Sequence, residues 1–198
     1  MKPLKPEDLF DLTRYELERA EYRASIIALK RARRVTVGNE LAFVFENHDT
    51  VRFQVQEMLR TERIVKPDAI QHELDVYNAL LPGDFELSAT LFVEIQDKAR
   101  IRPTLDRLVG IDEHVFLDVG DESVQATFDP KQFEQDRISA VQYVRFPLGP
   151  QLAARFRDES VRVVLRAAHP AYTQATEITG AARRSLCEDL RLDPRDVH

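Results

Sequence analysis

The sequence predicts an α+β fold in one domain, residues 1–198: a mainly antiparallel, curved sheet with a long N-terminal helix, two central helices and a C-terminal helix packed on it. Two observations predict this class. The β-rich runs come mostly in adjacent pairs around turn residues, which favours antiparallel pairing. Segments with apolar residues at every third or fourth position lie at both ends of the chain and in its second quarter. Residues 193–198 are expected to be a frayed tail.

The first element is a long helix over about residues 8–33, whose apolar face is interrupted by Arg19. This side chain either snorkels to the edge of the face, which we favour, or reaches an internal carboxylate. Four cations lie at the C-terminal end of this predicted helix: Lys30, Arg31, Arg33 and Arg34. We favour their role as complements of the helix dipole over a patch for an anionic ligand.

Residues 35–37 and 41–45 flank Gly38 and Asn39, which readily adopt positive φ, so a hairpin is predicted. Residues 51–62 fit a strand by alternation and a helix by spacing. Because the segment is rich in good helix formers, we favour a helix with Asp49 or Thr50 as its N-cap, starting within one or two residues of that position.

The next helix begins at Pro67 and ends before Pro82. Residues 85–95 alternate between apolar and mostly polar side chains, which indicates a half-buried strand, and a short helix follows over 103–109. A second hairpin is predicted for 114–119 and 123–128, and further strands for 138–146 and 161–167, with a short helix over 150–156 between them. Residues 171–190 are expected to form the C-terminal helix, with Gly180 weakening its middle.

Composition restricts the function classes. The net charge of −6 disfavours broad nucleic-acid binding. The chain has no apolar run that could span a bilayer and its N-terminus lacks a secretory pattern, so we expect no membrane partner and a cytoplasmic location. One cysteine agrees with a reducing compartment, and the few glycines form no phosphate-binding loop.

A dense polar stretch, residues 46–60, is the first candidate site. Arg52 and Gln56 share a face whether the segment is a helix or a strand, and Gln54 and Glu57 share the neighbouring helical face. A curved sheet could gather Glu94, Arg145 and this face around one cavity, with Gln142 on the opposite side of its strand. Arginines beside a carboxylate would bind an anionic or amide-bearing ligand. An ordinary buried ion-pair network is the competing interpretation, and we favour it.

Two histidines lie in a turn or at a strand end, where functional side chains are common. His48 is in a turn, where Asp49 or Glu46 could orient it, although capping of the next helix is the simpler role. His169 ends a predicted strand, close to Tyr172, and a plain turn histidine is the simpler interpretation there. No local spacing is typical of a metal site, but ligands could converge from His169, Glu57 and Glu94.

Five blocks in order, FENHDTVRFQVQEMLRTERI, ELDVYNALLP, ELSATLFVEI, SAVQYVRF and HPAY, resemble a bacterial family known only as domain of unknown function 3501. By that resemblance the recurrent polar positions are Glu46, Asn47, Asp49, Arg52, Gln54, Gln56, Glu57, Tyr77, Asn78, Glu94, Gln142, Arg145, His169 and Tyr172. The resemblance implies arginine at position 48, which argues against a catalytic His48. It also implies gene neighbours that encode rubrerythrin-like and iron–sulfur oxidoreductase proteins.

The leading hypothesis is therefore an accessory protein in peroxide or iron metabolism. It would bind a ligand or a redox partner in one hollow lined by a polar cluster of Arg52, Gln56, Glu57, Glu94, Arg145 and His169. One alternative is a metal-dependent enzyme with His169 and either Glu57 or Glu94 in its site. Another is a structural interaction domain. The sequence specifies no cofactor, reaction or oligomeric state.

Overall fold

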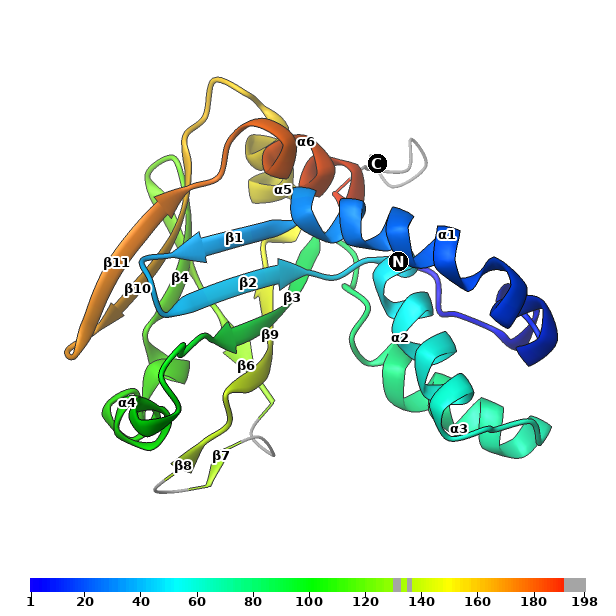
Figure 1. Cartoon of the computed structure of the whole chain (residues 1–198). Coiled ribbons are helices and arrows are strands. Elements are labelled where there is room, and N and C mark those ends of the chain that lie inside the picture. Colours follow the sequence, from blue (N-terminus) through cyan, green and yellow to red (C-terminus); the bar gives the residue numbers. More distant parts are fainter. Residues whose placement is uncertain (130–132, 135–136, 191–198) are drawn as a thin grey trace.

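A computed structural model describes residues 1–129, 133–134 and 137–190 of the chain (Figure 1). The expected tail over 193–198 lies outside the described residues. In chain order the elements are η1 (Pro6–Asp8), α1 (Leu12–Ala32), β1 (Arg34–Val37), β2 (Leu41–Phe45), α2 (His48–Thr61), α3 (Pro67–Asn78), β3 (Glu86–Val93), η2 (Lys98–Arg100), α4 (Ile101–Arg107), η3 (Ile111–Glu113), β4 (Val115–Val119), β5 (Glu122–Gln125), β6 (Thr127–Phe128), β7 (Phe133–Glu134), β8 (Arg137–Ile138), β9 (Val141–Pro147), α5 (Gly149–Arg157), β10 (Val163–His169), β11 (Tyr172–Glu177) and α6 (Gly180–Asp189). The α+β class is confirmed.

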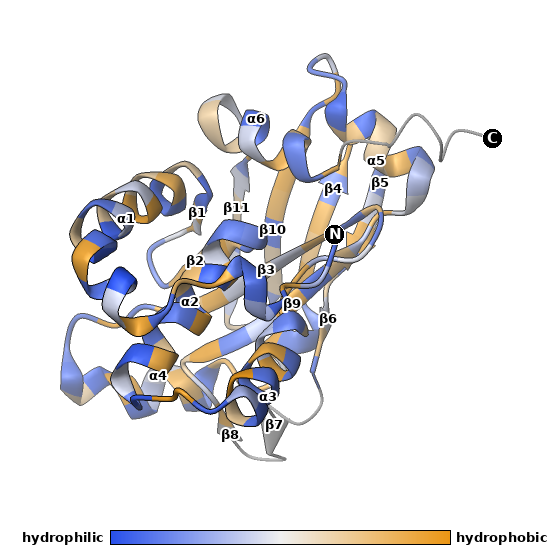
Figure 2. Cartoon of the chain, turned by 90° about the vertical axis from the view of Figure 1, so that its right-hand side faces the viewer, coloured by the Kyte–Doolittle hydropathy of each residue, from blue (hydrophilic) through white to orange (hydrophobic). Residues whose placement is uncertain are grey.

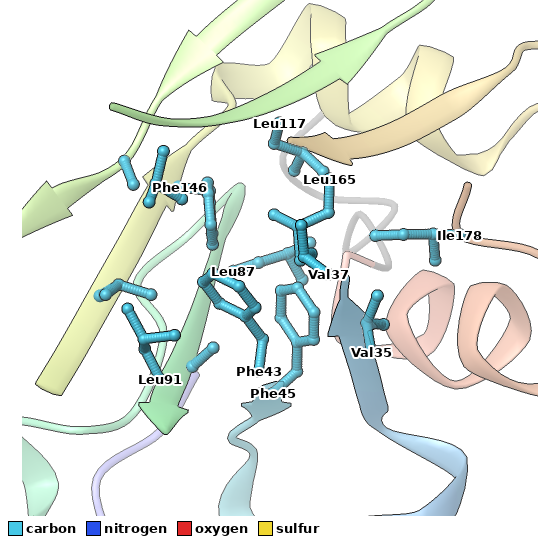
Figure 3. Packing of buried hydrophobic residues seen from close by; sticks show 14 of the residues in the cluster. Val35, Val37, Phe43, Phe45, Leu87, Leu91, Leu117, Phe146, Leu165 and Ile178 are labelled. Carbon is cyan, nitrogen blue, oxygen red and sulfur yellow. The ribbon is translucent and has the colours of Figure 1, made fainter. Parts of the chain in front are cut away.

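Antiparallel pairing is also confirmed, but the strands form two main sheets. The first sheet has the order β1-β2-β3-β9-β6 and the second β11-β10-β4-β5, while β7 and β8 form a small ribbon. The inner faces of the main sheets share one apolar core, in which Phe43, Leu117, Phe146 and Leu165 are fully buried (Figure 3). In Figure 2 the strands β4 and β10 are coloured largely as hydrophobic, as expected for strands that line a core.

The two sheets are joined along their edges. The predicted second hairpin is present as β4 and β5, but the chain then crosses at Ala126 to pair as β6 with β9 of the first sheet. At another edge the Tyr172 hydroxyl donates to the Val37 carbonyl (2.6 Å) and accepts from the Glu40 N–H (3.1 Å). Gly38 has φ of +65°, and a Cβ there would lie 2.2 Å from the Tyr172 hydroxyl oxygen, so only glycine suits this turn.

The helices α1, α2 and α3 lie together beside one end of the first sheet (Figure 1). They share a second apolar cluster that includes Leu4, Val55, Leu59 and Leu74. The predicted helix over 51–62 is confirmed as α2, although its N-cap is Asn47 rather than Asp49 or Thr50. The Asn47 side chain accepts from the Thr50 N–H (3.0 Å), and the Thr50 hydroxyl accepts in return from the Asn47 N–H (2.9 Å). None of the helices in the described part of the chain has the length and apolar character of a bilayer span.

The prediction of one helix over residues 171–190 is wrong, because the first part of this segment is strand β11 and only Gly180–Asp189 is helical. A two-residue turn after His169 returns the chain against β10, where β-favouring Tyr172, Thr173 and Thr176 pair along the ladder. The helical spacing of Ala175 and Ile178 was therefore accidental. Gly180 begins the helix instead of weakening its middle.

The prediction that β3 is half-buried is also wrong. Its outer face carries Ser88 and Thr90, which are 4% and 5% exposed. Ser88 donates to the Leu80 carbonyl after α3 (2.7 Å), so the helical layer covers polar side chains that would otherwise face solvent. Alternation of polarity reports the pleat of a strand, but it does not report what later covers each face.

Two expectations for α1 are corrected. Arg19 reaches a carboxylate, Glu57 of α2, rather than the edge of the helix. Among the four cations, Lys30 and Arg31 lie in the last helical turn as expected. Arg33 is buried and pairs with Asp189 of α6, and Arg34 pairs from β1 with Glu94. These two arginines therefore connect elements instead of complementing the dipole.

Candidate functional site

A cleft of about 530 Å³ lies on the outer face of the first sheet, beside the C-terminal end of α1. Its walls combine three kinds of side chain. Apolar and aromatic groups come from Ile27, Val44, Phe92, Val141 and Tyr143, cations from Lys30, Arg31 and Arg34, and carboxylates from Glu46 and Glu94. A smaller cleft of about 340 Å³ adjoins it, because Glu46 and Tyr143 line both. Such mixed linings are typical of sites for small organic molecules.

Glu46 is the most unusual group in this cleft, since it is a carboxylate only 3% exposed. Three neutral groups donate to it: the Thr50 hydroxyl at 2.5 Å, the Thr90 hydroxyl at 2.6 Å and the Gln54 amide at 3.0 Å. Across the described ranges, no lysine, arginine or histidine forms an ion pair with its side chain. The carboxylate is therefore oriented by dipoles and carries an uncompensated charge at the cleft wall.

Local sequence explains this arrangement. Glu46 directly follows the fully buried strand β2, so the backbone that leaves the core fixes its position. Because α2 begins two residues later, Thr50 and Gln54 stand one turn apart and point the same way. Thr90 comes from the outer face of the neighbouring strand β3, whose backbone also receives the Glu46 N–H through the Ser88 carbonyl (2.8 Å). Strand β2 therefore positions the Glu46 carboxylate, and α2 and β3 supply its hydrogen-bond donors.

The cations lie at the α1 side of the cleft. Arg34 pairs with Glu94 at 2.5 Å, so its charge is compensated. Lys30 and Arg31 form no ion pair within the described residues, and the Lys30 ammonium lies 5.7 Å from the centre of the Phe53 ring. The cleft is thus negative where Glu46 lies and positive at Lys30 and Arg31, with an apolar floor of Val44 and Phe92.

The predicted site residues on the other face of α2 make structural contacts. Gln56 is fully buried, and its amide accepts from the Phe10 N–H and donates to the Phe10 carbonyl, both at 3.0 Å. Arg52 lies over the Phe10 and Tyr22 rings, with its Cζ 4.7 and 5.6 Å from their centres. Asp49 is exposed in the first turn of α2. Of these residues, Gln56 and Arg52 fasten the N-terminal segment to the helix.

Glu57 shares the helical face of Gln54, one turn further along α2, and it also makes structural contacts. It receives both ends of the Arg19 guanidinium at 2.8 Å and the Tyr15 hydroxyl at 2.6 Å. These hydrogen bonds, with Arg19 first, lower the pKa of Glu57 to about 2 despite partial burial. Burial, followed by the bond to Glu57, raises the pKa of Tyr15. For this part of the predicted site, the structure shows the buried ion-pair network that we weighed against a ligand site.

His169 and Tyr172 lie elsewhere, at the turn between β10 and β11 next to α4 (Figure 1). The Ala171 N–H donates to His169 Nδ1 (3.2 Å), so the proton belongs on Nε2, which donates to the Val109 carbonyl (3.0 Å). Both nitrogens of His169 are therefore engaged by backbone. Arg52 and His169 thus contact different segments of the described chain, and the structure does not bring them together as the sequence led us to expect.

The remaining predicted residues divide between the two sides of the first sheet. Gln142 faces the interior, where its amide donates to the Ser139 carbonyl (3.0 Å). Arg145 faces outward, pairs with Glu86 and donates to the Leu81 carbonyl (3.2 Å), and it borders the smaller cleft. From the predicted set, Gln54 and Glu94 line the main cleft.

Sequence reasoning missed the centre of this site. Glu46 was considered only as a group that could orient His48 and as a polar position implied by resemblance, and Thr50 and Thr90 were not considered as its donors. One signal was available, because a carboxylate directly after an entirely apolar strand is held near the core and needs partners. The pairing of that carboxylate with Thr90, 44 residues away, had no sequence signal.

The three candidate metal ligands, His169, Glu57 and Glu94, are not brought together either. His169 lies at the β10–β11 turn, Glu57 between α1 and α2, and Glu94 at the main cleft, each with the protein partners given above. Within residues 1–129, 133–134 and 137–190, no group of three or more His, Cys, Asp or Glu side chains is placed to hold a metal ion.

Fold and site together define an α+β protein of two facing antiparallel sheets with a charged cleft on an outer sheet face. Comparison with known proteins extends this description. The chain belongs to the family described as protein of unknown function DUF3501, which it matches over residues 3–190. It is similar to a protein of unknown function from Burkholderia pseudomallei K96243, whose crystal structure has a TM-score of 0.89 and 37% sequence identity, covering 96% of this chain and 100% of that one. No curated protein matches the chain.

Proposed function

We propose that this protein is an accessory binding protein whose ligand, a small organic molecule, occupies the cleft on the outer face of the first sheet. The observation that carries the proposal is the Glu46 carboxylate, buried at the cleft wall and oriented by three neutral donors. A carboxylate removed from water costs free energy unless partners compensate its charge. Three hydrogen bonds fix the orientation of the Glu46 carboxylate without neutralising its charge. The group is thereby preorganised for a ligand.

The rest of the cleft supports the same function. Its volume of about 530 Å³ falls in the range of small-molecule sites. Ile27, Val141 and Tyr143 are each more than a third exposed, and all three line this cleft. Large apolar side chains that remain exposed around one hollow provide the contact area that a ligand would bury.

The link to peroxide, redox or iron metabolism is part of this proposal. Its support is the family resemblance, which implies rubrerythrin-like or iron–sulfur oxidoreductase proteins as partners. A binding protein without a reaction of its own would serve such partners by delivering or sensing a small molecule. A mixture of the purified protein with a purified rubrerythrin-like protein, analysed by size exclusion, tests this part, and separate elution at micromolar concentrations contradicts it.

Thermal-shift screening of a small-molecule collection tests the binding function. A ligand in the cleft raises the melting temperature of the parent protein by mass action. The shift should be lost in Glu46→Gln and retained in the control Arg162→Gln, which removes a charge from an exposed side chain directly before β10. Stabilising compounds that act equally on the parent and on Glu46→Gln would show that the site is elsewhere, and no stabilising compound in a broad collection would contradict the function.

A further inference from the structure

We propose that the occupant of the cleft carries two opposite poles, an ammonium or similar cationic donor bound by Glu46 and an acidic group bound by Lys30 and Arg31. This inference rests on the proposed binding function and names the chemical class of its ligand. The best match is a small zwitterionic molecule whose poles are separated by an apolar body.

The Glu46 pole follows from hydrogen-bond capacity and charge. A carboxylate can accept about four hydrogen bonds, and Glu46 receives three, two at Oε2 and one at Oε1. Arg33 donates to the Glu46 backbone carbonyl (3.0 Å), and its charge is matched by Asp189. Oε1 therefore retains an acceptor position and an unmatched charge. A cationic N–H donor satisfies both.

The opposite pole follows from the two cations of the last α1 turn. Lys30 and Arg31 both line the cleft, and in the described chain neither is paired with a carboxylate. Glu94 does not reach them as an ion-pair partner, because it is engaged by Arg34. An ammonium and a guanidinium side by side are suited to a carboxylate or a phosphate.

The space between the poles is apolar. Val44 and Phe92 form this part of the cleft from the outer faces of β2 and β3, and Val141 and Tyr143 come from β9. A hydrocarbon chain or a flat ring would lie on these side chains, whereas a sugar or a polyol would leave its hydroxyls without partners. The arrangement thus selects an apolar body as well as charged ends.

Titration of the protein with ω-amino acids tests the inference. The probes are 4-aminobutanoate, 6-aminohexanoate and 8-aminooctanoate, with hexanoate and hexylamine as probes of one pole each, followed by NMR of the Phe92 and Tyr143 ring signals. We expect at least one zwitterion to bind about tenfold more tightly than either single-pole probe, as one additional charge-assisted contact provides.

Two variants should each abolish the recognition of one pole of the ligand. Glu46→Gln should lose the preference for an amino acid over hexanoate, and the double variant Lys30→Met and Arg31→Met should lose the preference for an amino acid over hexylamine. The control Arg162→Gln should bind like the parent. Because Glu46 is buried, each variant is first compared with the parent by circular dichroism and melting temperature, and Thr90→Val provides a milder change at the same pole.

The outcomes separate the two proposals. Equal binding of hexanoate or hexylamine and the zwitterions would overturn the two-pole inference and leave the cleft as a binding site. Ring signals that respond to none of the five probes would overturn the inference, while the thermal-shift screen independently decides whether the cleft binds another class of molecule.

Discussion

Two pairs of polar residues on the same helix, α2, are used in opposite ways. Gln56 and Glu57 are matched with Phe10, Tyr15 and Arg19, so their donors and acceptors are occupied within the protein. Thr50 and Gln54 instead orient Glu46, whose charge remains unmatched beside a cleft. The first arrangement stabilises the docking of α1 and the N-terminal segment. The second places a charge where a ligand can reach it.

This difference shows why density of polar residues is a poor indicator of function. Arg52 and Glu57 are as conspicuous in the sequence as Glu46, yet the aromatic rings and the Arg19 ion pair engage them locally. What distinguishes a candidate site is a buried polar group with unused capacity next to open volume. Three substitutions in α2 test whether its polar residues divide in this way.

Gln56→Ala should lower the free energy of unfolding by about 3 kcal/mol, because it removes a fully buried side chain and leaves the Phe10 N–H and carbonyl without their partners. Urea denaturation followed by circular dichroism measures this loss. Binding of ligands in the cleft should be unchanged at temperatures where the variant is folded. A variant as stable as the parent would show that Gln56 does not fasten the N-terminal segment.

The Arg19–Glu57 pair should make stability depend on acidic pH. The folded state lowers the pKa of Glu57 from its ordinary 4.5 to about 2, so the contribution of the pair is complete above about 4.5 and is lost as pH falls toward 2. Glu57→Gln should cost about 1.5 kcal/mol at neutral pH, and its difference from the parent should shrink between pH 5 and 2. Unfolding free energies across that range measure the difference. A difference that does not change with pH would contradict this role.

Gln54→Ala should change stability least, by about 0.5 kcal/mol, since Gln54 is only partly buried and Glu46 keeps two hydroxyl donors. It is the matched partner of Gln56→Ala, with the same substitution two positions away on the same helix. Binding in the cleft should weaken several-fold because the carboxylate is less firmly oriented. If Gln54→Ala is the more destabilising of the two, the assignment of a structural role to Gln56 and a binding role to Gln54 is reversed.

Most of the fold was predictable from local pattern. The spacing of apolar residues predicted α1, α2 and α3, and the turn at Gly38 predicted the first hairpin, because these elements depend on neighbours a few residues away. Residues 172–177 show the limit. Their helical spacing and their β propensity disagreed, and pairing with β10 decided in favour of a strand.

The candidate site was predictable only in part. Gln54 and Glu94 were predicted among polar residues that could share a site, and both line the main cleft. Arg52 and His169 were expected to share one hollow, but they contact different segments, since nothing in a sequence reports which of many polar side chains a fold will bring within reach.

Local patterns in the sequence were sufficient to predict the antiparallel α+β class and most element boundaries to within a few residues, and the composition gives a negative net charge that disfavours nucleic-acid binding. The folded structure was needed to show that Arg19 meets Glu57, that Ser88 and Thr90 are covered, and that Glu46 lines the same cleft as Lys30 and Arg31. The difference arises from how far apart along the chain the interacting residues lie. Periodicity and turn chemistry act over a few residues, whereas burial and charge compensation depend on segments that meet only after the chain has folded.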